Sequence, residues 1–121
     1  MGIVIGIDVG ISTTKIVGIV EQGKVLSPIR IKATDPVTSL YGAFGKFLYV
    51  NKIQLQDIEK VMLTGVGSAY INEPIYNLPT EKAEEFIADG LGARYETKLD
   101  RMIVVSMGTG TSIVKCDGED I

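Results

Sequence analysis

Histidine is absent from this chain of 121 residues, and cysteine occurs only once. Without histidine the chain cannot form Ser-His-Asp triads, Cys-His pairs or histidine general bases, and nearly all catalytic zinc sites are excluded. The single cysteine, Cys116, cannot form an internal disulfide or hold a metal cluster alone, which fits a reducing cytosol. Any chemistry must therefore use carboxylates, hydroxyls, Lys or Arg, and backbone amides, with or without a divalent metal.

The charge balance and the hydropathy exclude further classes of function. The 12 Lys and Arg against 15 Asp and Glu give a net charge of -3, so nucleic acid is not expected as a partner. No apolar run approaches the roughly 20 residues of a membrane-spanning helix, and no basic region precedes the apolar N-terminus. We therefore expect no membrane partner and a cytoplasmic location.

The apolar periodicity predicts a mixed sheet with helices. Strands are expected at 3–7, 13–21, 25–33, 61–63, 102–105 and 113–116, and helices at 37–51 and 80–95, the second with Thr80 as its N-cap. Three antiparallel strands followed by alternating helices and strands are typical of an α/β fold with a mixed sheet. No linker or low-complexity tract divides the chain.

Two segments of the chain are similar to each other. Residues 7–14 align with residues 105–112, and each segment is a strand, a loop rich in glycine and hydroxyls, and a β-branched strand. Chance similarity explains this about as well as a duplicated fold in which each half contributes one phosphate-binding hairpin. With duplication, the second half begins near Met102.

The first of the two loops has residues that suit phosphate binding. Gly10 exposes backbone amides in a tight turn. The side chains that follow it can donate to phosphate oxygens or add positive charge: Ser12, Thr13, Thr14 and Lys15. Asp8, at the end of a buried strand, is placed to hold Mg²⁺ directly or through water. A plain hairpin turn explains the same residues equally well, and no Walker A sequence occurs anywhere.

The second loop is denser in glycines and hydroxyls than a hairpin needs. Its residues are Gly108, Thr109, Gly110, Thr111 and Ser112. Two glycines alternate with three hydroxyls where one glycine usually suffices. This density favours phosphate or substrate binding.

The second predicted helix is acidic. Glu81, Glu85 and Asp89 recur every fourth residue, so they share one helix face. A solvated face is the ordinary interpretation of such a helix. A functional interpretation selects the carboxylate nearest Phe86 as a general base, and the residues alone leave Glu84 and Glu85 both open.

Four motifs occur in order along the chain: Gly6-Ile7-Asp8-Val9-Gly10 with Ser12, Thr14 and Lys15, then Leu63-Thr64-Gly65, then Glu84-Glu85-Phe86, then residues 107–112. Together they resemble type II pantothenate kinase, of the acetate-and-sugar-kinase/actin superfamily. The resemblance implies an α/β fold: a ribonuclease-H-like (actin-like ATPase) domain at residues 1–101, with flanking helices and a mixed five-stranded sheet that has three antiparallel strands. The first hairpin of a second such domain would follow at residues 102–121.

The resemblance also implies an activity, which is ATP-dependent phosphorylation of pantothenate, the first step of coenzyme A biosynthesis. It implies ATP and Mg²⁺ as cofactors, pantothenate as substrate, acyl-CoA as a feedback ligand and a homodimer. Asp8 through Lys15 would be the first ATP-phosphate loop, with Asp8 at the metal, and Glu85 would be the base that deprotonates pantothenate's primary hydroxyl. The second loop would divide its contacts between the nucleotide, through Gly108, Thr109 and Gly110, and the pantothenate or acyl-CoA pocket, through Thr111 and Ser112.

The chain departs from the family pattern in two ways. Ile11 stands where the family usually has a second glycine, which alters how closely phosphate approaches. The family's basic residue for pantothenate and its later glycine-rich loop would lie beyond Ile121, so we expect a fragment that lacks full activity.

Two alternative functions share the fold. One is the ATPase activator of 2-hydroxyacyl-CoA dehydratases, which has a similar Gly-Ile-Asp-Val-Gly start and holds an iron–sulfur cluster through cysteines across a dimer. Cys116 alone argues against it. The other is a non-catalytic module that binds nucleotide or acyl-CoA and regulates a partner.

Overall fold

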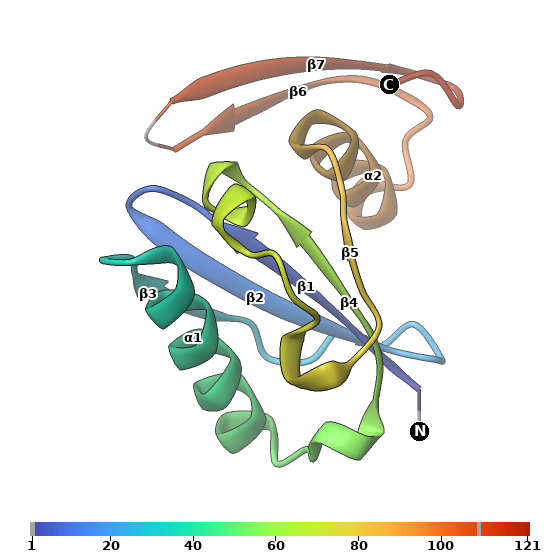
Figure 1. Ribbon diagram of the computed structural model, residues 1–121. Coiled ribbons are helices and arrows are strands. Elements are labelled where there is room, and N and C mark those ends of the chain that lie inside the picture. The colour runs from blue at the N-terminus through green and yellow to red at the C-terminus, as the bar shows by residue number, and fades with distance from the viewer. Residues whose placement is uncertain (1, 109) are drawn as a thin grey trace. The chain divides into compact units, whose positions relative to one another are not determined.

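The computed structural model describes residues 2–108 and 110–121, which form two compact units, Met1–Lys82 and Ala83–Ile121 (Figure 1). The first unit is a sheet with a helix, and the second is a helix with a two-stranded hairpin. The expected domain bounds, 1–101 and 102–121, stay a prediction. No helix in the described ranges has the length and apolar character needed to cross a membrane.

The first unit contains a five-stranded mixed sheet. Its strands are β1 (Ile3–Val9), β2 (Thr13–Val20), β3 (Ile29–Lys32), β4 (Ile58–Thr64) and β5 (Thr80–Lys82). Their order across the sheet is β3-β2-β1-β4-β5. The pairs β1–β2 and β2–β3 are antiparallel, whereas β1–β4 and β4–β5 are parallel. The expected mixed sheet with three antiparallel strands is confirmed.

Strict alternation along β1 separates a fully buried face from a partly exposed one. Ile3, Ile5, Ile7 and Val9 are almost completely buried, and helix α1 (Pro36–Asn51) covers them with its own buried face (Figure 1). That helix face consists of Leu40, Ala43, Phe44 and Phe47. Because successive side chains of a strand point to opposite sides, Asp8 lies on the face away from α1. The Asp8 side chain therefore lies outside the core that β1 forms with α1.

The second predicted helix begins later than expected, so Thr80 is not its N-cap. Residues 80–82 form β5, and α2 spans Glu85–Thr97 with Glu84 as the N-cap residue. The Thr80 hydroxyl accepts from the Ile75 amide and donates to the Leu78 carbonyl, so it stabilises the turn before the strand. Glu81 therefore does not share a helix face with Glu85.

The third strand is shorter than the predicted 25–33. It covers only Ile29–Lys32, and Val25 makes an isolated bridge to Ile19. Pro28 lies between the two, and because proline has no amide hydrogen it cannot donate to the ladder there.

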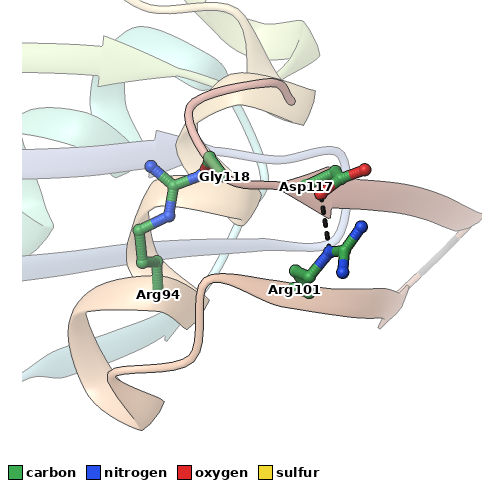
Figure 2. A network of polar contacts seen from close by, with 4 residues as sticks. All are labelled: Arg94, Arg101, Asp117 and Gly118. Atoms are coloured by element: carbon green, nitrogen blue, oxygen red, sulfur yellow. Dashed lines mark hydrogen bonds and ion pairs between the residues drawn. The ribbon is translucent and has the colours of Figure 1, made fainter.

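The second unit packs α2 against a hairpin of β6 (Arg101–Met107) and β7 (Thr111–Asp117). Figure 2 shows the polar contacts that hold it: Arg94 of α2 donates through Nη2 to the Gly118 carbonyl, and Arg101 Nε donates to Asp117 Oδ1 at 2.8 Å. Arg94 therefore ties the helix to the turn that follows β7.

The cap of α1 predicts a pH dependence of stability. The Thr38 backbone amide donates to Asp35 Oδ2 at 2.9 Å, and this bond, with a further one from the Thr38 side chain, holds the pKa of Asp35 below its ordinary value. A lowered folded-state pKa means that the stabilisation is present above the unfolded-state pKa and is lost as pH falls through the folded-state pKa. We expect Asp35→Ala to lower the Tm at pH 7 and the difference from wild type to shrink progressively below pH 4. Thermal unfolding of both proteins at several pH values measures this, and a difference that does not change with pH would contradict it.

Candidate functional site

The turn between β1 and β2 is a tight three-residue connection, residues 10–12. The Gly10 amide donates to the Thr13 carbonyl at 3.0 Å, and the Ala33 amide donates to the Ser12 carbonyl at 2.9 Å. A Cβ at Gly10 would lie 2.6 Å from the Thr13 carbonyl oxygen, so no other residue fits there without a shift of the backbone. Ile11, at the tip, is exposed.

Asp8 and Lys15 face each other beside this turn. They are partners in the β1–β2 register, and Lys15 Nζ lies 3.7 Å from Asp8 Oδ2. The side chains are 54% exposed for Lys15 and 34% exposed for Asp8. An ion pair this open contributes little to stability, so both charged groups are available to a ligand.

Thr64 and Gly65 complete the surroundings of Asp8. Thr64 is the register partner of Asp8 on the parallel strand β4, and its Oγ1 is buried without a hydrogen-bond partner in the described structure. Gly65 has φ +91°, and a Cβ there would lie 2.4 Å from Asp8 Oδ1 and 2.5 Å from the Val9 carbonyl oxygen. The turn after β4 therefore packs directly against the Asp8 carboxylate, with no room for a side chain at Gly65.

The two threonines at the start of β2 lie on opposite faces. Thr13 shares the face of Asp8 and Lys15, whereas Thr14 pairs with Val9 on the face that α1 covers. Thr14 is 0% exposed, and its Oγ1 has no hydrogen-bond partner among the described residues. The expected phosphate contacts of Ser12, Thr13, Thr14 and Lys15 stay predictions. Thr14 offers a ligand no exposed side chain.

The oxygen atoms around Asp8 suit a magnesium ion whose remaining ligands are water and phosphate oxygens. Within residues 2–108 and 110–121, no three Asp, Glu or Cys side chains cluster as a metal site. Mg²⁺ commonly uses only one or two protein carboxylates and completes its shell with waters and phosphate oxygens. Asp8, with the unpartnered Thr64 hydroxyl beside it, suits that mode of binding.

The second unit also contains a hairpin, formed by β6 and β7. β6 has the same seven-residue length as β1, and three residues, 108–110, again connect the strands. The Gly108 amide donates to the Gly110 carbonyl at 2.8 Å. Thr111 is exposed and Ser112 is half-buried on the face toward α2, whereas Thr109 lies outside the described residues. The last residue pair before the turn is Val9 with Thr14 in the first hairpin and Met107 with Thr111 in the second, so the two registers differ by one residue in the sequence alignment. The sequence similarity thus corresponds to the same order of strand, loop and strand, with different pairing at the turn.

Glu85 is the first residue of α2, and its side chain is exposed. Glu84, the N-cap residue, makes no capping hydrogen bond with its side chain. A helix N-terminus attracts negative charge, which suits a carboxylate that works in its ionised form. The choice between Glu84 and Glu85 as a base stays a prediction.

A pocket of about 260 Å³ lies elsewhere in the first unit, between α1 and the segment before β5. Its lining residues are Val37, Tyr41, Tyr70, Ile71, Asn72 and Glu73. None of the residues expected to bind nucleotide or substrate lines it.

No family model matches the chain, and no curated protein matches it in sequence. Solved structures do match it in fold. The activator of the 2-hydroxyisocaproyl-CoA dehydratase from Clostridium difficile, with bound ADPNP, matches with a TM-score of 0.70 at 15% identity over 93% of this chain and 46% of that one. Component A of the (R)-2-hydroxyglutaryl-CoA dehydratase from Acidaminococcus fermentans matches with a TM-score of 0.73 at 13% identity, over 93% of this chain and 47% of that one.

A kinase is similar to the chain as well. The ROK family glucokinase from Streptomyces griseus, in complex with glucose and AMPPNP, matches with a TM-score of 0.64 at 16% identity, over 98% of this chain and 46% of that one. These proteins share the actin-like ATPase fold, so the expected fold is confirmed. The chain spans about half the length of each of the three.

The turn after β4 adds two residues to the surroundings of Asp8 that were not among the expected site residues, Thr64 and Gly65. The segment Thr64-Gly65-Val66-Gly67 looks like an ordinary turn, yet it brings Thr64 and Gly65 against Asp8. The available signal was its place at the carboxyl end of an apolar strand, because neighbouring parallel strands end at the same edge of a sheet.

Proposed function

We propose that the chain is the nucleotide-binding part of an ATP-dependent kinase whose acceptor is pantothenate. The observation that carries this proposal is the turn at residues 10–12 with Asp8 and Lys15 beside it. Two similar structures were solved with ATP analogues, which supports nucleotide binding on this fold. Pantothenate as the acceptor rests on the resemblance of the motifs to type II pantothenate kinase.

In this proposal, each group in the chain has a separate task in phosphoryl transfer. Amides of the turn and the Lys15 ammonium hold phosphate oxygens, and Asp8 holds Mg²⁺, which supplies charge neutralisation when bound. Glu85 takes the proton of the acceptor hydroxyl while the oxygen of that hydroxyl bonds to the γ-phosphorus. The bond from that phosphorus to the β–γ bridging oxygen breaks, and ADP leaves with the electron pair.

A coupled ADP-release assay with pantothenate, pantetheine, acetate and glucose tests the acceptor. The assay should use both this chain and the longest natural protein that contains it. We expect the rate of ADP release with pantothenate to be well above the rates with the other three acceptors. Turnover with glucose or acetate alone would contradict pantothenate as the acceptor but would agree with a kinase function.

Asp8→Asn should weaken the dependence on Mg²⁺. Because the amide keeps the shape of the side chain but loses the charge, we expect the Mg²⁺ concentration for half-maximal activity to rise about tenfold or more at constant ATP. A Mg²⁺ titration of wild type and variant measures the shift. Asp57→Asn, a charge-matched change in the turn before β4, is the control, and superimposable titrations for Asp8→Asn would contradict the metal role.

A dehydratase activator is the second candidate. Its support is that two dehydratase components match with TM-scores of 0.70 and 0.73, above the 0.64 of the glucokinase. The one cysteine, Cys116, is buried and forms no disulfide. Iron analysis of protein purified without oxygen separates the candidates, since an activator with a cluster contains iron and the kinase does not.

A further inference from the structure

A row of side chains crosses the sheet on the face of Asp8. Arg30 of β3 is the register partner of Lys15 of β2, Lys15 is the partner of Asp8 of β1, and Asp8 is the partner of Thr64 of β4. Directly paired residues on neighbouring strands share a face, and in an antiparallel pair their Cβ atoms lie about 5 Å apart. The row therefore places two cations, one carboxylate and one hydroxyl in a line.

Lys32 adds a third cation toward the turn. It pairs with Thr13 in the β2–β3 register and lies on the same face as Arg30, two residues along the strand. Both Arg30 and Lys32 are exposed. Around one carboxylate, this corner of the sheet carries three positive charges, although the whole chain has a net charge of -3.

The arrangement leaves two of these cations without a protein partner. Asp8 pairs with Lys15, and among the described residues no ion pair or side-chain hydrogen bond involves Arg30 or Lys32. Like charges directly opposite each other on a sheet are unfavourable, and the Arg30–Lys15 pair is of this kind. An anion lying across the two strands would relieve that repulsion.

We propose that Arg30 and Lys32 extend the phosphate site beyond the turn and bind the polyphosphate chain of the nucleotide. The inference rests on the proposed function, because it places the added cations beside the same turn and the same Asp8. A single phosphate reaches the turn and Lys15, whereas a chain of two or three phosphates also spans the neighbouring strand. The positively charged patch formed by Arg30 and Lys32 thus selects nucleoside triphosphates and diphosphates over monophosphates.

The test compares two double variants of equal charge. Arg30→Gln with Lys32→Gln removes the two cations, and Lys24→Gln with Lys46→Gln removes two exposed cations elsewhere, in the turn after β2 and on α1. Calorimetric titration with MgATP, AMP and tripolyphosphate at fixed ionic strength gives the dissociation constants. Because each charge near phosphate is worth about 1 kcal/mol in water, a roughly fivefold loss per residue is expected.

The Arg30 and Lys32 double variant should therefore bind MgATP and tripolyphosphate about 20-fold more weakly and AMP almost unchanged. The Lys24 and Lys46 double variant should stay within about twofold of wild type. Equal losses in the two double variants, or an equal loss for AMP, would overturn the proposal. Circular dichroism and Tm confirm folding, and the single variant Arg30→Lys, which keeps the charge, should bind nearly as wild type.

Failure of this inference and failure of the proposed function give different results. If wild type and the Arg30 and Lys32 double variant bind MgATP equally well, the inference about Arg30 and Lys32 is contradicted and the proposed kinase function is not. Wild type that binds tripolyphosphate through Arg30 and Lys32 but binds no MgATP supports the patch and contradicts the nucleotide function. Wild type that binds neither ligand overturns both.

Discussion

In the longest natural protein that contains this chain, replacing Glu85 with Gln is expected to lower the kcat of pantothenate phosphorylation about 100-fold or more, with ATP affinity changed by less than about twofold. General-base catalysis contributes factors of this size, and the amide keeps the shape of the side chain while losing its ability to accept a proton. Glu85 begins α2 and its side chain is exposed, so the substitution opens no cavity in the core. Steady-state kinetics with a direct ATP-binding measurement give both quantities.

Glu84→Gln is the matched control for this prediction. Glu84 is adjacent in sequence, is also exposed and makes no capping bond with its side chain, so its loss should reduce kcat by less than about threefold. A large loss with Glu84→Gln and near-normal turnover with Glu85→Gln would reverse the assignment of the base.

Gly65→Ala is expected to have the largest effect on the first unit. The new Cβ would lie 2.4 Å from Asp8 Oδ1 and 2.5 Å from the Val9 carbonyl oxygen, and φ at this position is +91°. Strain in a backbone conformation that essentially only glycine adopts and overpacking each cost about 1–3 kcal/mol, so a loss of roughly 3 kcal/mol is expected. For a unit of this size the Tm should fall by more than about 10 °C, and Mg²⁺ dependence should weaken because Asp8 is displaced.

The chain offers a glycine for comparison. A Cβ at Gly45, in the exposed side of α1, would meet nothing within 4 Å. Alanine there should raise stability by about 0.5–1 kcal/mol, because glycine has the higher conformational entropy in the unfolded chain. Equal Tm values for Gly65→Ala and Gly45→Ala would mean that the turn after β4 does not press on Asp8.

The elements that local chemistry determines were predictable. α1 was expected at 37–51 and covers Pro36–Asn51, because its apolar stripe is visible in the sequence. The β1–β2 hairpin follows from β-branched strands around Gly10. β5 was missed because Thr80-Glu81-Lys82 has no apolar pattern and becomes a strand only by pairing with distant β4.

In the candidate site, too, the residues close in sequence were predictable and those from distant strands were not. Asp8 and Lys15 were expected as site residues from the loop between them, and the structure places them in an ion pair. The place of Arg30 and Lys32 beside this site could not be predicted from the sequence, because it depends on the pairing of β3 with β2 across an irregular segment that contains Pro28. The burial of Thr14 follows from simple alternation along β2, and its distinction from Thr13 was available in principle.

The most direct test of the central claim maps where a nucleotide binds. ¹⁵N-labelled chain would be titrated with the Mg²⁺ complex of a non-hydrolysable ATP analogue, and amide shifts would be followed by NMR. The account predicts saturable shifts centred on Gly10, Ser12, Thr13 and Lys15, with little change in the pocket between Val37 and Tyr70. Shifts confined to that pocket, or no shift at saturating nucleotide, would contradict it.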